Sequence, residues 1–474
     1  MNTVRHVGAV AAAALVLMYT GAGVEQAVAT QPTGAAASAA RPDVPAGVPY
    51  YAGKLNPEVN TLRYNLSLRW DGRALSGSAS VVFQTTRTTS TVRLDLLHSL
   101  RVSKVDLDGR PIGFTHLQNG LAMNVGHLVR GVHHTFTIEY SGIPHSVTAP
   151  SRRGDFAEGL GWQTDPQGHV YTFQEPFGAF TWYPVNDYPA DKAFYDAQIT
   201  VPSTDVAVFN GALTGRSPAG PGMTTYRWHM GRPAASYLTT IAIGPYTGYH
   251  DTMPNGTPAV YWLLPRDRSV LPRLEYQARD AFSWLQRHAG PYPFDRFGVV
   301  VVAGSSAMET QTLVTMSRKT LDRPDAVVEH EMAHQWFGDA VTPTKWQGLW
   351  LNEGWAMWMQ QAYEKYRGGY QYLGGMKNWR YYDVQSRRTC GPPGHYNPRT
   401  FGALNVYLGP AMMLNRIRVQ IGPVEFLKLA KAWVAEHEYG HVSRDEFIRW
   451  VNAQTGQNFT SLINLWLDSP RTPR

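Results

Sequence analysis

The segment RPDAVVEHEMAHQWFGDAV (residues 323–341) has the apolar spacing of one α-helix and contains the pattern His-Glu-x-x-His. On a helix that ends near Gly338, His330 and His334 are four residues apart and point the same way. Glu331 lies beside them. A zinc hydrolase needs three protein ligands and an open position for water. The segment therefore predicts two metal ligands and a neighbouring carboxylate.

Glu353 is the candidate for the third ligand. It lies nineteen residues after His334, in the segment GLWLNEGWAMWMQQAYEKY, which begins a second helix. This separation allows a turn and a return on an antiparallel helix. The alternative is a core helix with buried polar groups, which would leave each of them unsatisfied at a cost of about 1–3 kcal/mol. We therefore predict one zinc ion per chain, held by His330, His334 and Glu353.

A second copy of the pattern occurs in the segment KAWVAEHEYGHVSRDEF. Here Gly440 lies between the two histidines, and Ser443 with Glu446 forms a capping box that starts a new helix. A helix that ends before this glycine cannot align His437 with His441, and no further histidine follows to complete a site. We expect both histidines on an inter-helix loop away from the metal.

Hydrophobic periodicity divides the chain into two parts and predicts a multidomain α+β protein. Segments such as RYNLSLRW, TVRLDLL and TFTIEY alternate with period two, which predicts an antiparallel β-sandwich or saddle domain over residues 50–246. A mixed α/β, mainly helical domain is expected over residues 247–474. Its predicted helices cover residues 271–290, 324–338, 349–367, 409–420, 423–438 and 444–454.

Composition indicates a globular protein, with 43% hydrophobic and 17% charged residues. The net charge of +7 is scattered along the chain, so a solvated basic surface is favoured over nucleic-acid binding. Cys390 is the single cysteine, which excludes an internal disulfide. His395 is the one histidine near it, and a catalytic thiol has no task in a zinc site.

The N-terminus has the features of an export signal. A basic lead precedes the apolar run VGAVAAAALVLMYTG, which is too short to span a membrane, and small residues allow cleavage after Ala29. Residues 30–49 are rich in Ala and Pro and predict a flexible spacer. No cysteine lies near the cleavage point for a lipid anchor, so we expect a secreted protein without a stable membrane anchor.

The pattern HExxH, followed after eighteen residues by the glutamate of Trp-Leu-Asn-Glu-Gly, resembles the gluzincin metallopeptidases, in particular the M1 aminopeptidase family. The resemblance runs from about residue 55 to the end. It implies a thermolysin-like catalytic domain after the β domain. Larger family members continue into further domains that cover the cleft, so we expect this chain to have an open site that admits peptides easily.

The segment SSAMETQT resembles the family's Gly-Ala-Met-Glu-Asn substrate-binding segment. Ala307, Met308 and Glu309 match, whereas Ser306 and Thr310 depart from the usual Gly and Asn. The resemblance implies that Glu309 binds the free α-amine of the substrate, and a carboxylate is the sensible partner of an ammonium group.

Two further positions follow from the resemblance. Glu175, nine residues before Pro184, matches a second amine-binding residue, and a loop of the β domain would thus complete the site. Tyr407, in VYLGPAMMLNRIR, matches a tyrosine whose hydroxyl contacts the developing oxyanion, although Gly409-Pro410 replaces the usual Lys-Gly. An ordinary loop glutamate and a packing tyrosine are the alternatives.

These observations favour a secreted zinc aminopeptidase that acts on peptides with a free N-terminus, with Glu331 as general base. One alternative is an M1-like hydrolase of a non-peptide substrate, of the epoxide hydrolase type. The other is a catalytically silent peptide-binding protein, which would be expected to lack Glu331 or a ligand. The preferred first residue, the natural substrate, the oligomeric state and the role of Cys390 stay open.

Overall fold

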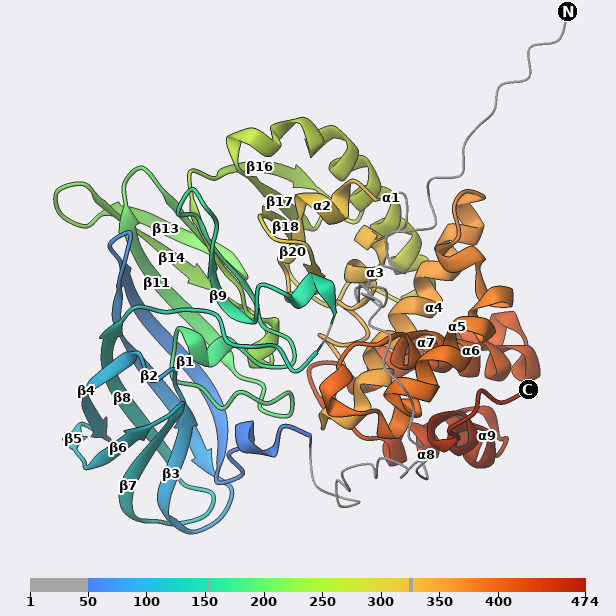
Figure 1. The fold of residues 1–474 in the computed structure, drawn as a ribbon, viewed down its shortest axis with the longest axis horizontal. Helices are drawn as coiled ribbons and strands as arrows, with labels where there is room; N and C mark the ends of the chain where they lie inside the picture. The colour runs from blue at the N-terminus through green and yellow to red at the C-terminus, as the bar shows by residue number, and fades with distance from the viewer. Residues whose placement is uncertain (1–49, 152, 324–326) are drawn as a thin grey trace, which may run out of the picture.

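The computed structural model describes residues 50–151, 153–323 and 327–474 (Figure 1). The predicted export signal and spacer lie outside these residues. In the described part, β-sheets form one side of the molecule and helices the other, with a smaller sheet between them (Figure 1). No helix in this part is long and apolar enough to cross a membrane.

The largest sheet has eight strands in the order β13-β14-β11-β1-β2-β8-β4-β5. Its pairs are antiparallel except β1 with β11, which run parallel. The alternating side chains of β1 predicted to face inward, including Tyr64, Leu66 and Leu68, are buried, which confirms the period-two interpretation. The strands are β1 (Val59–Trp70), β2 (Leu75–Thr85), β4 (Leu100–Leu107), β5 (Arg110–Pro111), β8 (His133–Gly142), β11 (Phe194–Pro202), β13 (Ala212–Pro218) and β14 (Met223–His229).

Two smaller sheets complete the β-rich part. One has the order β3-β7-β6 and the other the order β12-β15-β10-β9. The segment that contains Glu175 follows β10 directly. These strands are β3 (Thr89–Asp95), β6 (Phe114–Leu117), β7 (Gly120–Leu128), β9 (Gly161–Thr164), β10 (Val170–Phe173), β12 (Val206–Phe209) and β15 (Ile241–Gly244).

A five-stranded sheet with the order β16-β17-β18-β20-β19 follows. Helix α1 (Leu271–Ala289) connects β17 to β18, and Gly290 ends it with a φ of +104°, at the predicted glycine. The short strand β19 stands at the end of the sheet order. The strands are β16 (Thr247–Thr252), β17 (Pro258–Leu263), β18 (Phe297–Val302), β19 (Ala307–Met308) and β20 (Val314–Ser317).

Helices dominate the rest of the chain. The predicted helix over 349–367 is confirmed to the residue, whereas α6 begins at Leu404 and not at 409. Three helices, α2, α5 and α9, were not predicted. The elements are α2 (Arg318–Leu321), α3 (Val327–Ala333), α4 (Leu349–Arg367), α5 (Met376–Cys390), α6 (Leu404–Ile421), α7 (Pro423–His437), α8 (Arg444–Thr455), α9 (Thr460–Asp468) and the paired strands β21 (Thr342–Pro343) and β22 (His441–Val442).

The prediction that one helix runs from 324 to 338 was wrong in its end point. Helix α3 ends at Ala333 and is followed by tighter turns. In one of them Trp336 N donates to Ala333 O, three residues earlier. His334 N still donates to His330 O at 3.3 Å, so the helical register extends through the second histidine. The two histidines therefore share one face despite the shorter helix.

The buried side chains form two large hydrophobic clusters, one mainly under the β-rich part and one under the helices. Tyr407 packs against both clusters. Polar contacts also join the two parts: Lys192 Nζ donates to the carbonyl oxygens of Asp339 and Ala340, and Asn210 Nδ2 donates to Gln311 O. The candidate site lies where these two parts meet.

Candidate functional site

Helices α3 and α4 bring together the three predicted zinc ligands. His330 Nε2 lies 3.2 Å from His334 Nε2, and Glu353 Oε2 lies 3.3 Å and 3.4 Å from these two nitrogens. All three side chains are buried, with residue exposures of 8%, 1% and 3%. The packing of α4 against α3 thus places Glu353 against both histidines.

The donor set fits a divalent cation. His334 Nδ1 lies 3.0 Å from Phe337 O, so this nitrogen carries the proton and Nε2 presents a lone pair. That lone pair faces the carboxylate of Glu353, which can only accept. Two imidazole nitrogens and a carboxylate are the ligands that zinc prefers in hydrolases.

Glu331 stands next to this triad on α3. Glu309, Glu331 and His334 offer oxygen and nitrogen atoms within 4.8 Å of one another. Burial raises the pKa of Glu331 to about 8, and the charge of Glu309 adds to the rise. A neighbouring divalent cation acts in the opposite direction, because it favours the ionised carboxylate.

Glu175 and Glu309 follow strands of two different sheets, β10 and β19, and their charges interact. Burial raises the pKa of both carboxyl groups, and the charge of Glu309 raises that of Glu175 further. In the described part of the chain, one carboxylate oxygen of each has no hydrogen-bond partner. Two buried carboxylates with free oxygens form a natural site for a cation.

Ala307 and Met308 form β19, which pairs with β20 on one side only within the sheet order. Glu309 follows directly. The edge of such a strand offers backbone groups to an extended peptide. Thr310, which stands where the family usually has Asn, is buried and bonds to Leu313 O and Thr315 Oγ1.

Tyr407 lies in the first turns of α6, beside the triad. Its ring is 5.9 Å from the ring of His330 with an interplanar angle of 25°. The Gly409-Pro410 pair does not interrupt α6; Pro410 instead packs closely against Gly354 of α4. The local turn that the sequence placed in doubt is therefore continuous helix.

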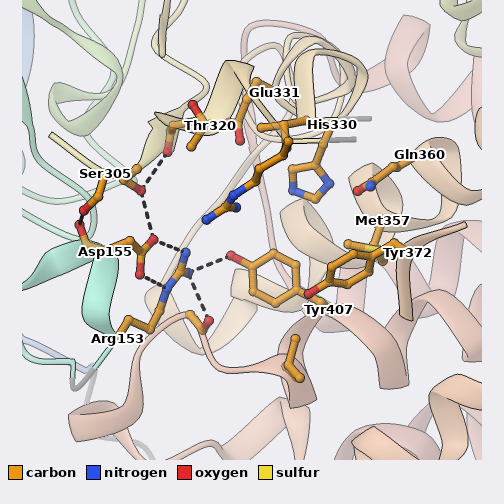
Figure 2. Close-up of a pocket in the computed structure, with 16 residues that line it drawn as sticks. Arg153, Asp155, Ser305, Thr320, His330, Glu331, Met357, Gln360, Tyr372 and Tyr407 are labelled. Atoms are coloured by element: carbon orange, nitrogen blue, oxygen red, sulfur yellow. Dashed lines mark hydrogen bonds and ion pairs between the residues drawn. The ribbon is translucent and has the colours of Figure 1, made fainter. Parts of the chain in front are cut away.

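A cavity of about 90 Å³, open to solvent, leads to the site. His330, Glu331 and Tyr407 contribute to its wall, together with the apolar side chains of Val327, Met357 and Leu404. Figure 2 shows the hydroxyl of Tyr407 and the imidazole of His330 on one side and Arg153 with Asp155 on the other. Arg153 donates to Tyr407 Oη at 3.0 Å.

Arg153 and Asp155 were not identified from the sequence. Arg153 precedes and Asp155 belongs to a short 3-10 helix (Gly154–Phe156) of the β-rich part, far from Tyr407 along the chain. A single charged residue outside a periodic pattern does not indicate which distant segment it contacts. The sequence therefore did not place Arg153 or Asp155 at the site.

The second HExxH segment is elsewhere. His437 is the last residue of α7 and bonds to Trp433 O, whereas His441 is exposed in β22. Tyr439 between them has a φ of +66°, and the predicted capping box of Ser443 and Glu446 is present. The predicted break in the helix is confirmed, with His437 at the helix end and not on the loop.

The fold and the ligand geometry define a metal-dependent hydrolase of the gluzincin type. The peptidase M1 N-terminal domain matches residues 60–238, and the peptidase family M1 domain matches residues 276–466. The chain belongs to peptidase family M1, whose solved relatives are zinc enzymes, and both results agree with the predicted family and fold.

Several relatives are similar over most of this chain. The M1 zinc metallopeptidase of Deinococcus radiodurans superposes with a TM-score of 0.77 at 23% identity, covering 89% of this chain and 96% of that one. A variant of it was solved with a Tyr-Ser-Ala substrate, with a TM-score of 0.76.

Curated relatives are longer. Aminopeptidase N of Streptomyces lividans is 24% identical over 68% of this chain and 41% of its own length. Leucine aminopeptidase 2 of Aspergillus fumigatus is 25% identical over 67% of this chain and 52% of its own length. The chain thus spans about half or less of these proteins.

Proposed function

We propose that the protein is a zinc aminopeptidase that hydrolyses the N-terminal peptide bond of peptides. The observation that carries the proposal is the pair of buried carboxylate oxygens on Glu175 and Glu309, which lack partners in the described residues and lie beside a metal triad. A site for a cation next to a hydrolytic metal centre selects substrates whose ammonium group is close to the scissile bond.

His330, His334 and Glu353 would hold the zinc ion. When bound, zinc supplies Lewis acidity, which makes a water molecule nucleophilic near neutral pH and polarises the scissile carbonyl. Glu331 accepts the proton of this water and passes it to the leaving amine. Its carboxylate is within reach of both His334 and Glu309, and so lies between the metal centre and the amine site.

Glu175 and Glu309 bind the ammonium group at the N-terminus of the substrate. A cation between the two carboxylates offsets the burial that raises their pKa values. Ala307 and Met308 align the peptide backbone along the edge of β19. The fixed distance from the amine site to the metal ligands then restricts cleavage to the first bond.

Tyr407 donates a hydrogen bond to the carbonyl oxygen as negative charge develops on it. Its ring is held against His330, so the hydroxyl stands beside the metal ligands. A donor that is already oriented stabilises the transition state without reorganisation.

The N-terminal composition supports export. Residues 1–29 have the basic lead, apolar run and small residues of a cleavable signal, so the mature protein would be secreted. N-terminal sequencing of protein exported by an expressing cell tests this expectation. A mature chain that retains Met1 would contradict it.

The activity is tested on aminoacyl-anilides with free and with acetylated amino groups, before and after treatment with a zinc chelator. We expect cleavage of the free-amine substrates alone, loss of activity with the chelator and recovery when zinc is restored. Glu331→Gln should retain zinc and lower kcat by about 10²–10⁴-fold, because proton transfer is lost.

Equal cleavage of acetylated substrates would exclude an exopeptidase. If neither substrate were cleaved and Glu331→Gln left peptide binding unchanged, the chain would be a peptide-binding protein. Hydrolysis of an epoxide without any cleavage of anilides would favour the non-peptide alternative.

A further inference from the structure

We propose that Arg153 is a positioning residue that reaches from the β-rich part to Tyr407 and directs the tyrosine hydroxyl toward the scissile carbonyl. The inference rests on the proposed aminopeptidase function, because it assigns a role in the same reaction.

The guanidinium group of Arg153 connects two sets of partners. On one side, Nε and Nη2 donate to the two carboxylate oxygens of Asp155 at 3.0 Å and 2.7 Å. On the other, Nη1 donates to Tyr407 Oη and to Gly402 O, both at 3.0 Å (Figure 2). The paired bonds to Asp155 hold the planar group in one orientation.

The direction of the Arg153–Tyr407 hydrogen bond determines where the tyrosine proton can go. Arginine only donates, so Tyr407 Oη is the acceptor and its own hydrogen must point elsewhere. Among the described residues, the structure shows no hydrogen bond that Tyr407 Oη donates. The hydroxyl is therefore left to donate to a ligand, while its ring is held against His330.

The surroundings of Arg153 are shaped to hold it. Ser306 Oγ donates to Asp155 Oδ2 at 3.0 Å, which gives a function to the serine that replaces the usual glycine of the family segment. Gly402 has a φ of +66°, and a Cβ there would collide with the guanidinium of Arg153. Ser151 Oγ donates to Phe401 O and joins the same two loops.

Burial increases the effect of this arrangement. The side chains of Arg153 and Asp155 are 17% and 8% exposed, so their charges are only weakly screened. A cation bonded to Tyr407 Oη polarises the O–H bond and strengthens its donation to an oxyanion. A residue that only linked the two parts of the molecule would not polarise the O–H bond of Tyr407.

Arg153→Met tests the proposal, since methionine retains much of the side-chain length and removes every donor. We expect kcat on a free-amine aminoacyl-anilide to fall about tenfold or more, the rate equivalent of one charge-assisted hydrogen bond, with KM changed by less than about twofold. In a Tyr407→Phe background, Arg153→Met should change kcat by less than about twofold, because the hydroxyl to which Arg153 donates is already absent.

Arg266→Met is the matched control. Arg266 joins the same two parts of the molecule through Asp165, at 2.8 Å, and does not belong to the residues that line the cavity. This control should retain the kcat of the unsubstituted chain. If Arg153→Met lowered kcat equally with and without the Tyr407 hydroxyl, the proposal would be overturned. Arg153 would then only link the two parts of the molecule.

Arg153→Lys provides a second variant if methionine prevents folding. A single ammonium group cannot donate hydrogen bonds to Asp155, Gly402 and Tyr407 with the geometry of the guanidinium group. The kcat of Arg153→Lys should therefore lie between that of the unsubstituted chain and that of Arg153→Met. A lysine variant with unchanged kcat would contradict the need for the bidentate geometry.

A measurement on metal-free protein separates this inference from the proposed function. With ¹³Cζ-labelled tyrosine, the resonance assigned by Tyr407→Phe should shift in Arg153→Met and stay in place in Arg266→Met. If the unsubstituted chain cleaves no substrate, the aminopeptidase proposal fails whatever this resonance does. If it cleaves substrate and the resonance does not move, the positioning role fails alone.

Discussion

At the scale of single residues, hydrogen bonding and position together distinguish structural carboxylates from candidate functional ones. Asp187 is fully buried, and its two oxygens accept hydrogen bonds from Gly178 N and Ser236 Oγ at 2.8 Å and 2.7 Å. Glu175 and Glu309 are also buried, with exposures of 7% and 4%, yet each keeps an oxygen without a partner in the described residues. Other buried carboxylates of the described residues, such as Asp191 and Asp383, also keep an unpartnered oxygen, so it is the proximity of Glu175 and Glu309 to His334 and Glu353 that makes them candidates for binding a cation.

The two HExxH segments make opposite predictions for metal content. Replacing His437 and His441 together with alanine should leave one zinc ion per chain, whereas His330→Ala should lose it, because only the latter removes a nitrogen from the triad. Elemental analysis of dialysed protein measures both. Loss of zinc in the His437/His441 variant would show that the wrong segment was assigned to the metal.

At the scale of elements, the position of the site depends on how closely α4 and α6 approach. Gly354 follows Glu353 directly, and a Cβ at Gly354 would lie 2.5 Å from Pro410 Cβ. The absence of a side chain on one helix thus lets the proline of the other pack against it. This contact places Tyr407 of α6 near the ligand on α4.

Gly354→Ala should therefore destabilise the protein although alanine is the better helix former. We expect a loss of about 1–3 kcal/mol in the free energy of unfolding, because overpacking outweighs helix propensity. Urea unfolding measures the change. Gly113→Ala, where a Cβ would meet open space, is the control and should be nearly neutral. A more stable Gly354→Ala would mean that α4 and α6 separate at little cost.

At the scale of the whole molecule, the site exists only where the two parts of the chain meet. Glu175 and Arg153 come from the β-rich part, whereas the triad and Tyr407 come from the helical part. Lys192 joins the same parts through Asp339 O and Ala340 O, which also accept hydrogen bonds from Thr342 Oγ1 and Tyr439 N. Contacts of this kind hold Glu175 and the candidate metal ligands in place relative to one another.

Lys192 also predicts a pH dependence of stability. Burial lowers its pKa from 10.5 to about 7, and the charge of Asp339 opposes this shift. Between pH 7 and about 10.5 the unfolded chain binds more protons at this position, so its contribution to the free energy of unfolding rises with pH, by at most about 1.4 kcal/mol per pH unit. The cost of burial is fully present below pH 7.

Lys192→Met should flatten this rise, since both carbonyl oxygens retain other partners. The difference between variant and unsubstituted protein in urea unfolding at pH 7, 8, 9 and 10 isolates the lysine from other titrating groups. The free energy of unfolding of Lys192→Met minus that of the unsubstituted protein should decrease as the pH rises. A difference that does not decrease would contradict the lowered pKa of Lys192.

Much of the fold and the core of the candidate site followed from local patterns. Alternation in β1 and the helical spacing of α1 and α4 depend on neighbours in the chain, so the elements could be predicted. The three candidate ligands could be proposed for the same reason, because HExxH and a glutamate nineteen residues on are constrained by helix geometry. The early end of α3 was missed, since turns after a helix depend on packing.

The sequence by itself determined the class of protein: the strand and helix periods, the triad and the choice between the two HExxH segments. Only the tertiary structure decided how Arg153, Asp155, Ser306 and Gly402 come together on Tyr407. Arg153 and Tyr407 are separated by 254 positions, and no period or spacing acts over such a distance. Their contact depends on the docking of two separately packed parts, which long-range burial and hydrogen bonding determine.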